Sequence, residues 1–300
     1  MKLKTLFMIA RAPFLILVFS CISVGFASAV HNGHFNISHA VLALIGSLLA
    51  HISVNILNEY YDYKKGTDLL THRTPFSGGS GALPSGLIDP SQAFNFGIGA
   101  LIIGIIIGVY FIILHPILLP IIIIASVIIS LYTPFLLKIR FAELFPGISF
   151  GPLLVIGSYI TQLPENFVGT LTLPTLASIP VGLLVTNLLF LNEFPDYEAD
   201  ANTGRRHGVI LLGRMRASKL YVLILSLTFI SIIVPVTLSI FPLTTLISLA
   251  TLPIAVMTSK NVLKNCDNPG KLIPSLAQNT LIVLITPILL ALGLMLRLIF

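Results

Sequence analysis

Charge is what this 300-residue chain has least of. Asp, Glu, Lys and Arg make up only 9% of it, and only 11 residues are acidic. With 56% hydrophobic residues and a mean hydropathy of +1.00, the composition excludes a soluble domain and places the chain in a lipid bilayer. Cysteine is also scarce. Cys21 and Cys266 lie far apart in the sequence, and they indicate neither a disulfide framework nor a metal site.

Long apolar runs are abundant, and they predict the fold class. A membrane-spanning helix needs roughly 20 apolar residues, and the chain has nine stretches of about that length. The predicted fold is therefore an all-α membrane protein with about nine transmembrane helices in one bundle, and residues 1–300 form a single domain. We place the helices near residues 9–28, 38–57, 92–114, 117–136, 143–162, 173–192, 218–240, 242–258 and 275–298.

The basic residues predict the orientation of this bundle. If the N-terminus is cytoplasmic, 16 of the 17 Lys and Arg residues fall in inside segments, and only Arg297 falls outside. This asymmetry follows the positive-inside rule. It predicts a multi-pass protein of the cell membrane, and it explains the net charge of +6 without nucleic-acid binding. A secretory signal peptide is the alternative for the N-terminus, because Ala27-Ser28-Ala29 resembles a cleavage site.

The few acidic residues gather in two similar motifs, Asn58-Glu-Tyr-Tyr-Asp-Tyr63 and Asn192-Glu-Phe-Pro-Asp-Tyr197. Both end a helix that runs from outside to inside. The chain therefore contains two parallel pseudo-repeats, with an active-site cavity that opens to the cytoplasmic side. Cation exchangers also carry duplicated acidic motifs, but commonly as inverted repeats with midplane sites. The motifs and their tails hold seven of the 11 acidic residues: Glu59, Asp62, Asp68, Glu193, Asp196, Glu198 and Asp200.

The spacing within each motif suits a divalent cation. Asn58 and Asp62 share one helix face, and Asn192, Asp196 and Asp200 follow one helical stripe. Pro195 should kink or restart the second helix. Magnesium prefers oxygen ligands and is usually held by one or two carboxylates together with substrate phosphate. The candidate Mg²⁺ ligands are Asn58, Glu59, Asp62, Asp68, Asp196 and Asp200.

Basic and glycine-rich loops follow both motifs, and they are suited to binding phosphate. A third element, Tyr132-Thr-Pro-Phe-Leu-Leu-Lys138, is expected at the cytoplasmic end of the fourth helix. The candidate substrate-binding residues are Asn58, Lys65, Arg73, Asn192, Arg205 and Arg206.

Together these elements resemble the UbiA superfamily of intramembrane aromatic prenyltransferases. The Lys65-Gly66-x-Asp68 tail is similar to the branch that prenylates 1,4-dihydroxy-2-naphthoate in menaquinone biosynthesis. Two positions depart from that branch. Glu59 stands where aspartate is common, and the Ser77–Gly81 run lacks an expected arginine.

The resemblance implies a mechanism and a set of partners. A polyprenyl diphosphate would ionise with the help of Mg²⁺, and an aromatic acceptor would capture the allyl cation. Asp62, Asp196, Lys138 and Tyr132 would be the catalytic residues. No obligate protein partner is implied. Hydroxybenzoate and a glycerol-phosphate ether lipid remain alternative acceptors, and a cation or metabolite transporter is the alternative from another class.

Overall fold

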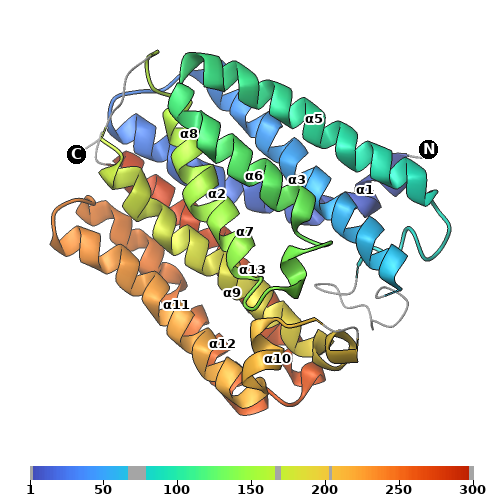
Figure 1. The fold of residues 1–300 in the computed structure, drawn as a ribbon. Coiled ribbons are helices and arrows are strands. Elements are labelled where there is room, and N and C mark those ends of the chain that lie inside the picture. The colour runs from blue at the N-terminus through green and yellow to red at the C-terminus, as the bar shows by residue number, and fades with distance from the viewer. Residues whose placement is uncertain (1–2, 67–78, 166–169, 203–204, 297–300) are drawn as a thin grey trace.

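The computed structural model describes residues 3–66, 79–165, 170–202 and 205–296, and every regular element in these segments is a helix (Figure 1). The predicted all-α fold is thus confirmed. The N-terminal part contains α1 (Leu3–Ile9), the 3₁₀ helix η1 (Ala12–Leu15), α2 (Ile16–His31), α3 (Ile37–Lys65), α5 (Pro90–Leu114), η2 (Pro116–Leu118), α6 (Leu119–Leu131) and η3 (Leu136–Lys138). The remainder contains α7 (Leu144–Ile148), the π-helix η4 (Ser149–Ile156), α8 (Gly157–Ile160), α9 (Thr172–Asn202), α10 (Gly208–Leu212), α11 (Arg214–Thr237), η5 (Leu243–Thr251), α12 (Leu252–Asn265) and α13 (Pro269–Leu296).

Seven helical segments among the described residues are long and apolar enough to cross a bilayer, so the chain is a multi-pass membrane protein. The other two predicted spans correspond to the shorter apolar segments Pro116–Leu131 and Leu144–Ile160. At 1.5 Å per residue, the 16 residues of Pro116–Leu131 extend about 24 Å, less than the roughly 30 Å thickness of the hydrocarbon core of a bilayer. The count of nine spans therefore stays a prediction.

Local signals in the sequence fix the ends of the helix that carries the first motif. At its start, the Asn36 side chain accepts a hydrogen bond from the His39 backbone N–H, as expected of an N-cap residue. At its end, Gly66 takes a left-handed conformation with φ 78°, which closes the helix. Asn58 and Asp62 therefore occupy the last turns of α3, which packs along most of α5.

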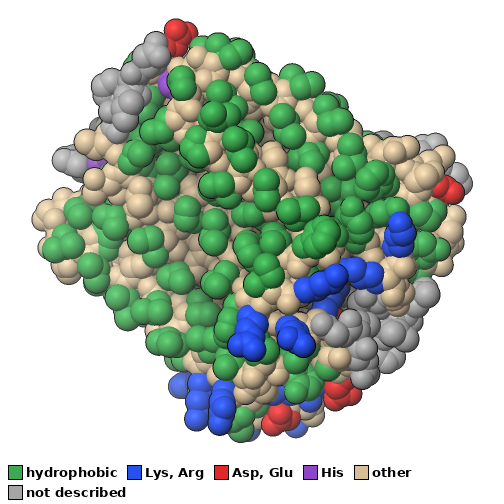
Figure 2. All heavy atoms as spheres, in the orientation of Figure 1, with side chains coloured by type: hydrophobic (Ala, Val, Ile, Leu, Met, Phe, Trp, Pro, Cys, Tyr) green, Lys and Arg blue, Asp and Glu red, His purple; other side chains and the backbone are tan. Residues whose placement is uncertain are grey.

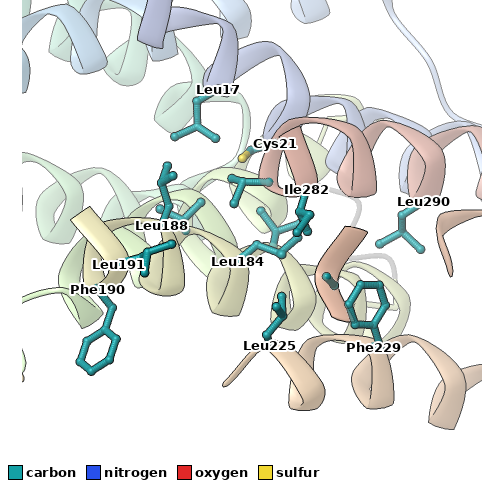
Figure 3. Close-up of a cluster of buried hydrophobic side chains, with 14 of the residues drawn as sticks. Leu17, Cys21, Leu184, Leu188, Phe190, Leu191, Leu225, Phe229, Ile282 and Leu290 are labelled. Atoms are coloured by element: carbon teal, nitrogen blue, oxygen red, sulfur yellow. The ribbon is translucent and has the colours of Figure 1, made fainter. Parts of the chain in front are cut away.

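The main buried core surrounds α9, against which α2, α11 and α13 pack (Figure 3). Leu184 and Leu191 of α9 are buried there with Leu225 of α11 and Ile282 of α13. The helix runs without interruption from Thr172 to Asn202. The helix therefore does not restart at Pro195, because surrounding helices hold α9 in place, and a kink at this position stays a prediction.

Close backbone contact joins the π-helix region to α9. A Cβ atom added at Gly151 would lie 2.6 Å from Gly182 Cα, and one added at Gly147 would overlap the Thr186 hydroxyl. Only glycine permits such an approach between helices. The contact places α7 and η4 beside the helix that carries the second motif.

The basic residues gather at one end of the molecule, around the C-terminal end of α3 and around α10 and α12 (Figure 2). Much of the remaining visible surface is hydrophobic. Exposed Ile, Leu and Val side chains run along α5, α6 and α11, as expected of lipid-facing helices. The two acidic motifs lie at the basic end.

Candidate functional site

A cavity of about 440 Å³ runs between α3, α5, α6, η4 and α9. Its lining is mostly apolar along the helices and polar at the basic end of the molecule. This arrangement brings both predicted motifs to one site. The motif residues that line the cavity are Asn58, Asp62, Asn192, Glu193, Asp196 and Asp200.

Arg205 joins the two motifs across the cavity. Its Nη2 donates to Asp62 Oδ1 at 2.7 Å, and its Nη1 lies 3.1 Å from Asp200 Oδ1. Both carboxylates are buried. Burial alone would lower the pKa of Arg205, but Asp62 and Asp200 raise it above its ordinary value. The site thus already holds one cation between carboxylates from α3 and α9.

His207 supplies a second positive charge beside the second motif. Its Nε2 lies 3.2 Å from Asp200 Oδ2, and its Nδ1 lies 3.1 Å from Glu193 Oε2. Burial lowers the pKa of His207, but the two carboxylates outweigh it and raise the pKa to about 9. His207 is therefore protonated at neutral pH.

The sequence prediction did not assign a role to His207, Glu193 or Glu143. The only sequence signal for His207 was its place in the loop after the second motif. Glu143 is buried, which raises the pKa of its carboxyl group. Its Oε1 accepts from the Gly208 backbone N–H at 3.1 Å. Glu143 thus anchors the loop that carries Arg205 and His207.

The segment that begins at Tyr132, the third element predicted from the sequence, is hydrogen-bonded to the first acidic motif and its tail. Asn58 Nδ2 donates to Thr133 Oγ1 at 3.0 Å, and Lys65 Nζ donates to the Thr133 carbonyl at 2.8 Å. Tyr132 lines the cavity, and burial raises the pKa of its phenol, which therefore stays neutral. Lys138 is exposed and lies over the Phe135 ring, with Nζ 5.9 Å from its centroid.

Glu59 is directed away from the other predicted ligands. Its side chain is fully buried, and Ser80 donates to it from the backbone N–H at 2.6 Å and from the hydroxyl at 2.7 Å. Arg11 Nε donates to it at 2.8 Å. Glu59 does not line the cavity, whereas Arg11 does. Arg11 of the N-terminal segment and Ser80, which lies in the run that lacks an arginine, thus donate to the same carboxylate.

The other predicted site residues have mixed outcomes. Asp196 lines the cavity, while Arg206 and Lys65 are exposed and do not line it. Asp68 and Arg73 lie outside the described residues.

The donor set fits a divalent cation that shares its coordination with a substrate. No group of three or more His, Cys, Asp or Glu side chains in the described segments is arranged as a metal cage. Carboxylates from two helices nevertheless meet around a cationic group, and the buried Asn192 Oδ1 on the cavity wall has no hydrogen-bond partner. Magnesium commonly takes only one or two protein carboxylates and completes its shell with phosphate and water.

Comparison with known proteins identifies a related family. Residues 17–271 match the UbiA prenyltransferase family. The 1,4-dihydroxy-2-naphthoate octaprenyltransferase of Escherichia coli (strain K12) is 27% identical over 95% of this chain and 93% of its own length. The Bacillus subtilis (strain 168) protein of the same name is 30% identical over 58% of this chain, and the match spans 55% of that relative.

The fold is also found in a solved structure. A UbiA homolog from Archaeoglobus fulgidus, described as bound to GPP and Mg²⁺, superposes with a TM-score of 0.60 at 15% identity. The superposition covers 95% of this chain and 99% of that chain.

Proposed function

The chain belongs to the UbiA prenyltransferase family, and from this premise we propose that it transfers a polyprenyl group from an allylic polyprenyl diphosphate to an aromatic acceptor. The observation that carries the proposal is the meeting of the two acidic motifs around Arg205, at the polar end of an apolar cavity. An amphiphile with an anionic head and a long apolar tail matches both parts of this cavity.

The diphosphate head is assigned to the polar end. Asp62, Asp196 and Asp200, with the amide oxygens of Asn58 and Asn192, would hold Mg²⁺. Bound there, Mg²⁺ would neutralise the diphosphate and favour its departure. The Mg²⁺-bound homolog from Archaeoglobus fulgidus supports this assignment.

Basic side chains complete the binding of the head group. Arg205 and Arg11 line the cavity, and their guanidinium N–H groups can donate to phosphate oxygens. Lys65 and Lys138 are exposed and do not line the cavity, but Lys65 lies near Asp62 and Arg205, and both lysines supply further positive charge. These groups hold the leaving diphosphate while the bond to the prenyl carbon breaks.

The neighbouring wall is suited to the reacting carbon. Tyr132 and Phe150 line the cavity, and aromatic faces stabilise cations. The apolar wall excludes water, which would otherwise capture the allyl cation as an alcohol. An electron-rich ring then forms the new carbon–carbon bond and loses a proton.

We propose a dihydroxynaphthoate-like acceptor, which places the chain in menaquinone biosynthesis. The names of the Escherichia coli and Bacillus subtilis relatives support this choice. We also propose that the chain is a single domain in the cell membrane. The asymmetric distribution of basic residues supports placing its N-terminus and the site loops in the cytoplasm.

Mass spectrometry of products from a small acceptor panel tests the proposal. The purified protein in liposomes would receive Mg²⁺, a prenyl diphosphate and one of three acceptors: dihydroxynaphthoate, hydroxybenzoate or a glycerol-phosphate ether lipid precursor. We expect a prenylated naphthoate product. A product from only one of the other acceptors would overturn the assignment of the acceptor, and the absence of any product would overturn prenyl transfer.

A further inference from the structure

A histidine, His51, stands midway along the membrane-spanning helix α3 (Ile37–Lys65). It is 9% exposed, and it lines the cavity. Ionisable side chains are costly inside a membrane, and they usually have a function there. His51 belongs to neither acidic motif, so its place on the cavity wall needs another explanation.

His51 differs from the polar residues one turn before and one turn after it on the cavity wall. Asn55 Nδ2 donates to the Ala10 carbonyl oxygen at 3.0 Å. The Ser47 hydroxyl donates to the Ala43 carbonyl oxygen at 2.8 Å. His51 Nδ1, in contrast, is buried and has no hydrogen-bond partner within the described segments. Because an unpaired buried polar atom costs free energy, this ring is suited to a partner that a ligand in the cavity would supply.

An aromatic side chain packs against the imidazole ring. The Phe150 ring of η4 meets the His51 ring edge to face, with centroids 5.0 Å apart. Both residues line the cavity, and Phe150 is only half-buried. This contact restrains the orientation of the imidazole ring and leaves an aromatic surface beside it. A flat aromatic ligand that packs on Phe150 can therefore place a polar substituent at His51.

The position of His51 relative to the first motif fits the acceptor. His51 precedes Asn58 by seven residues, which is nearly two helical turns, and both residues line the cavity. At 1.5 Å per residue they are about 10.5 Å apart along the helix axis. With the diphosphate at Asn58, the first prenyl carbon lies between the two residues. The acceptor ring must come within about 3–3.5 Å of that carbon, which brings the ring toward His51.

We propose that His51 binds a ring hydroxyl group of the aromatic acceptor and thereby selects a hydroxylated ring; this inference rests on the proposed function. An imidazole ring can accept a hydrogen bond from a hydroxyl group through its unprotonated nitrogen. The hydrogen bond orients the acceptor ring toward the prenyl carbon. His51 is thus a specificity-determining residue for the acceptor, whereas the acidic motifs bind the head group of the donor.

A matched pair of variants at this position gives the first test. The side chains in His51→Leu and His51→Gln have similar volumes, but only glutamine can form hydrogen bonds. For the protein in liposomes with Mg²⁺, we expect His51→Leu to raise the KM for dihydroxynaphthoate about tenfold, as for the loss of one hydrogen bond. The KM for the prenyl diphosphate should not change. His51→Gln should restore part of the loss, and Ile45→Ala, at an exposed position of α3, is the control.

Acceptor analogues give a second test, which begins with the wild-type protein alone. Replacing one hydroxyl group of dihydroxynaphthoate by a methoxy group removes a hydrogen-bond donor and leaves the ring electron-rich. We expect kcat/KM to fall about tenfold for one of the two methoxy analogues. His51→Leu should use that analogue and the parent acceptor equally, because the interaction is already lost. Equal use of all three acceptors by the wild type would overturn the inference.

Thermal unfolding distinguishes this role from a structural one. Because His51 Nδ1 is unpaired, His51→Leu should unfold at the same or a higher temperature. A lower midpoint with an unchanged KM for the acceptor would overturn the inference in favour of a structural role. A preference for the hydroxyl group that persists in His51→Leu, or a rise in the KM for the prenyl diphosphate alone, would also overturn the inference but leave prenyl transfer intact. A lack of transfer by the wild type to every acceptor would overturn both the proposed function and this inference.

Discussion

A single guanidinium, that of Arg205, holds together carboxylates that α3 and α9 bring face to face. Asp62 and Asp200 are almost completely buried, and two buried carboxylates repel each other unless a cation lies between them. A divalent cation bound between the same two carboxylates would likewise offset their repulsion. When metal and diphosphate bind, the guanidinium can exchange its carboxylate partners for phosphate oxygens.

Replacing Arg205 should make the stability of the protein depend on magnesium. In Arg205→Ala the two carboxylates lose their counter-charge, and breaking such a pair typically costs about 3–5 kcal/mol. We expect a lower thermal midpoint in EDTA and a partial recovery with Mg²⁺, because the metal replaces the missing charge. Arg206→Ala, at an exposed neighbour, is the control. Equal midpoints with and without Mg²⁺ would contradict the shared cation site.

The aspartates themselves should be required for chemistry more than for folding. Asp62→Ala and Asp196→Ala each remove one carboxylate from the cavity, and we expect prenyl transfer to fall more than about 100-fold. Membrane insertion should be unaffected. Asp267→Ala, at an exposed aspartate that does not line the cavity, should retain activity. Full turnover by either cavity variant would disprove the metal-binding role of the two motifs.

At the scale of elements, Glu59 links three parts of the chain that are separate in sequence. It joins α3 to the N-terminal segment through Arg11 and to the loop at Ser80. Its neighbour Asn58 faces the cavity, whereas Glu59 is turned toward these partners, because adjacent helical residues do not share a face.

A comparison of two Glu–Arg pairs tests this structural role. Glu59→Gln leaves Arg11 without a counter-charge beside a buried amide, and we expect a loss of about 3–5 kcal/mol in unfolding free energy. Glu198→Gln breaks the pair with Arg214, in which Glu198 is 81% exposed, and such pairs contribute about 0–1 kcal/mol. Denaturation in detergent would measure both. Similar losses in the two variants would show that Glu59 is not a structural anchor.

The contact between α7, η4 and α9 depends on glycine, and it can be tested with a matched pair. Gly147→Ala would push a methyl group into Thr186, and we expect destabilisation by about 1–3 kcal/mol, as for other overpacked contacts. Gly99→Ala, on α5, has no neighbour within 4 Å of the added Cβ and should gain about 0.5–1 kcal/mol of helix stability. If Gly147→Ala is as stable as Gly99→Ala, the close approach is not required.

At the scale of the whole molecule, the sequence predicted the membrane bundle and the meeting of its two motifs. Hydropathy was sufficient to predict helices because a segment that crosses lipid must satisfy its backbone hydrogen bonds within itself. Helix periodicity placed Asn58 and Asp62 on the cavity wall, and both lie there. These features depend on local pattern alone.

Features that depend on tertiary packing were not predictable from the sequence. Pro195 lies within a continuous helix because neighbouring helices hold it. Glu59 accepts a hydrogen bond from Arg11, 48 residues away in the sequence. The pKa of His207 is raised only because folding brings carboxylates next to it. A motif shows which side chains share a helix face, but it does not show which residues distant in sequence will bind them in the folded protein.

The central claim is that the two motifs form one magnesium-dependent site for a prenyl diphosphate. The most direct test is release of labelled diphosphate by the purified protein in liposomes, with and without Mg²⁺, in the presence of an aromatic acceptor. We predict release that requires Mg²⁺, matches the amount of prenylated product and disappears in Asp62→Ala. Cation flux across the liposome with no diphosphate released would contradict this account and would identify the acidic motifs as part of a transport site.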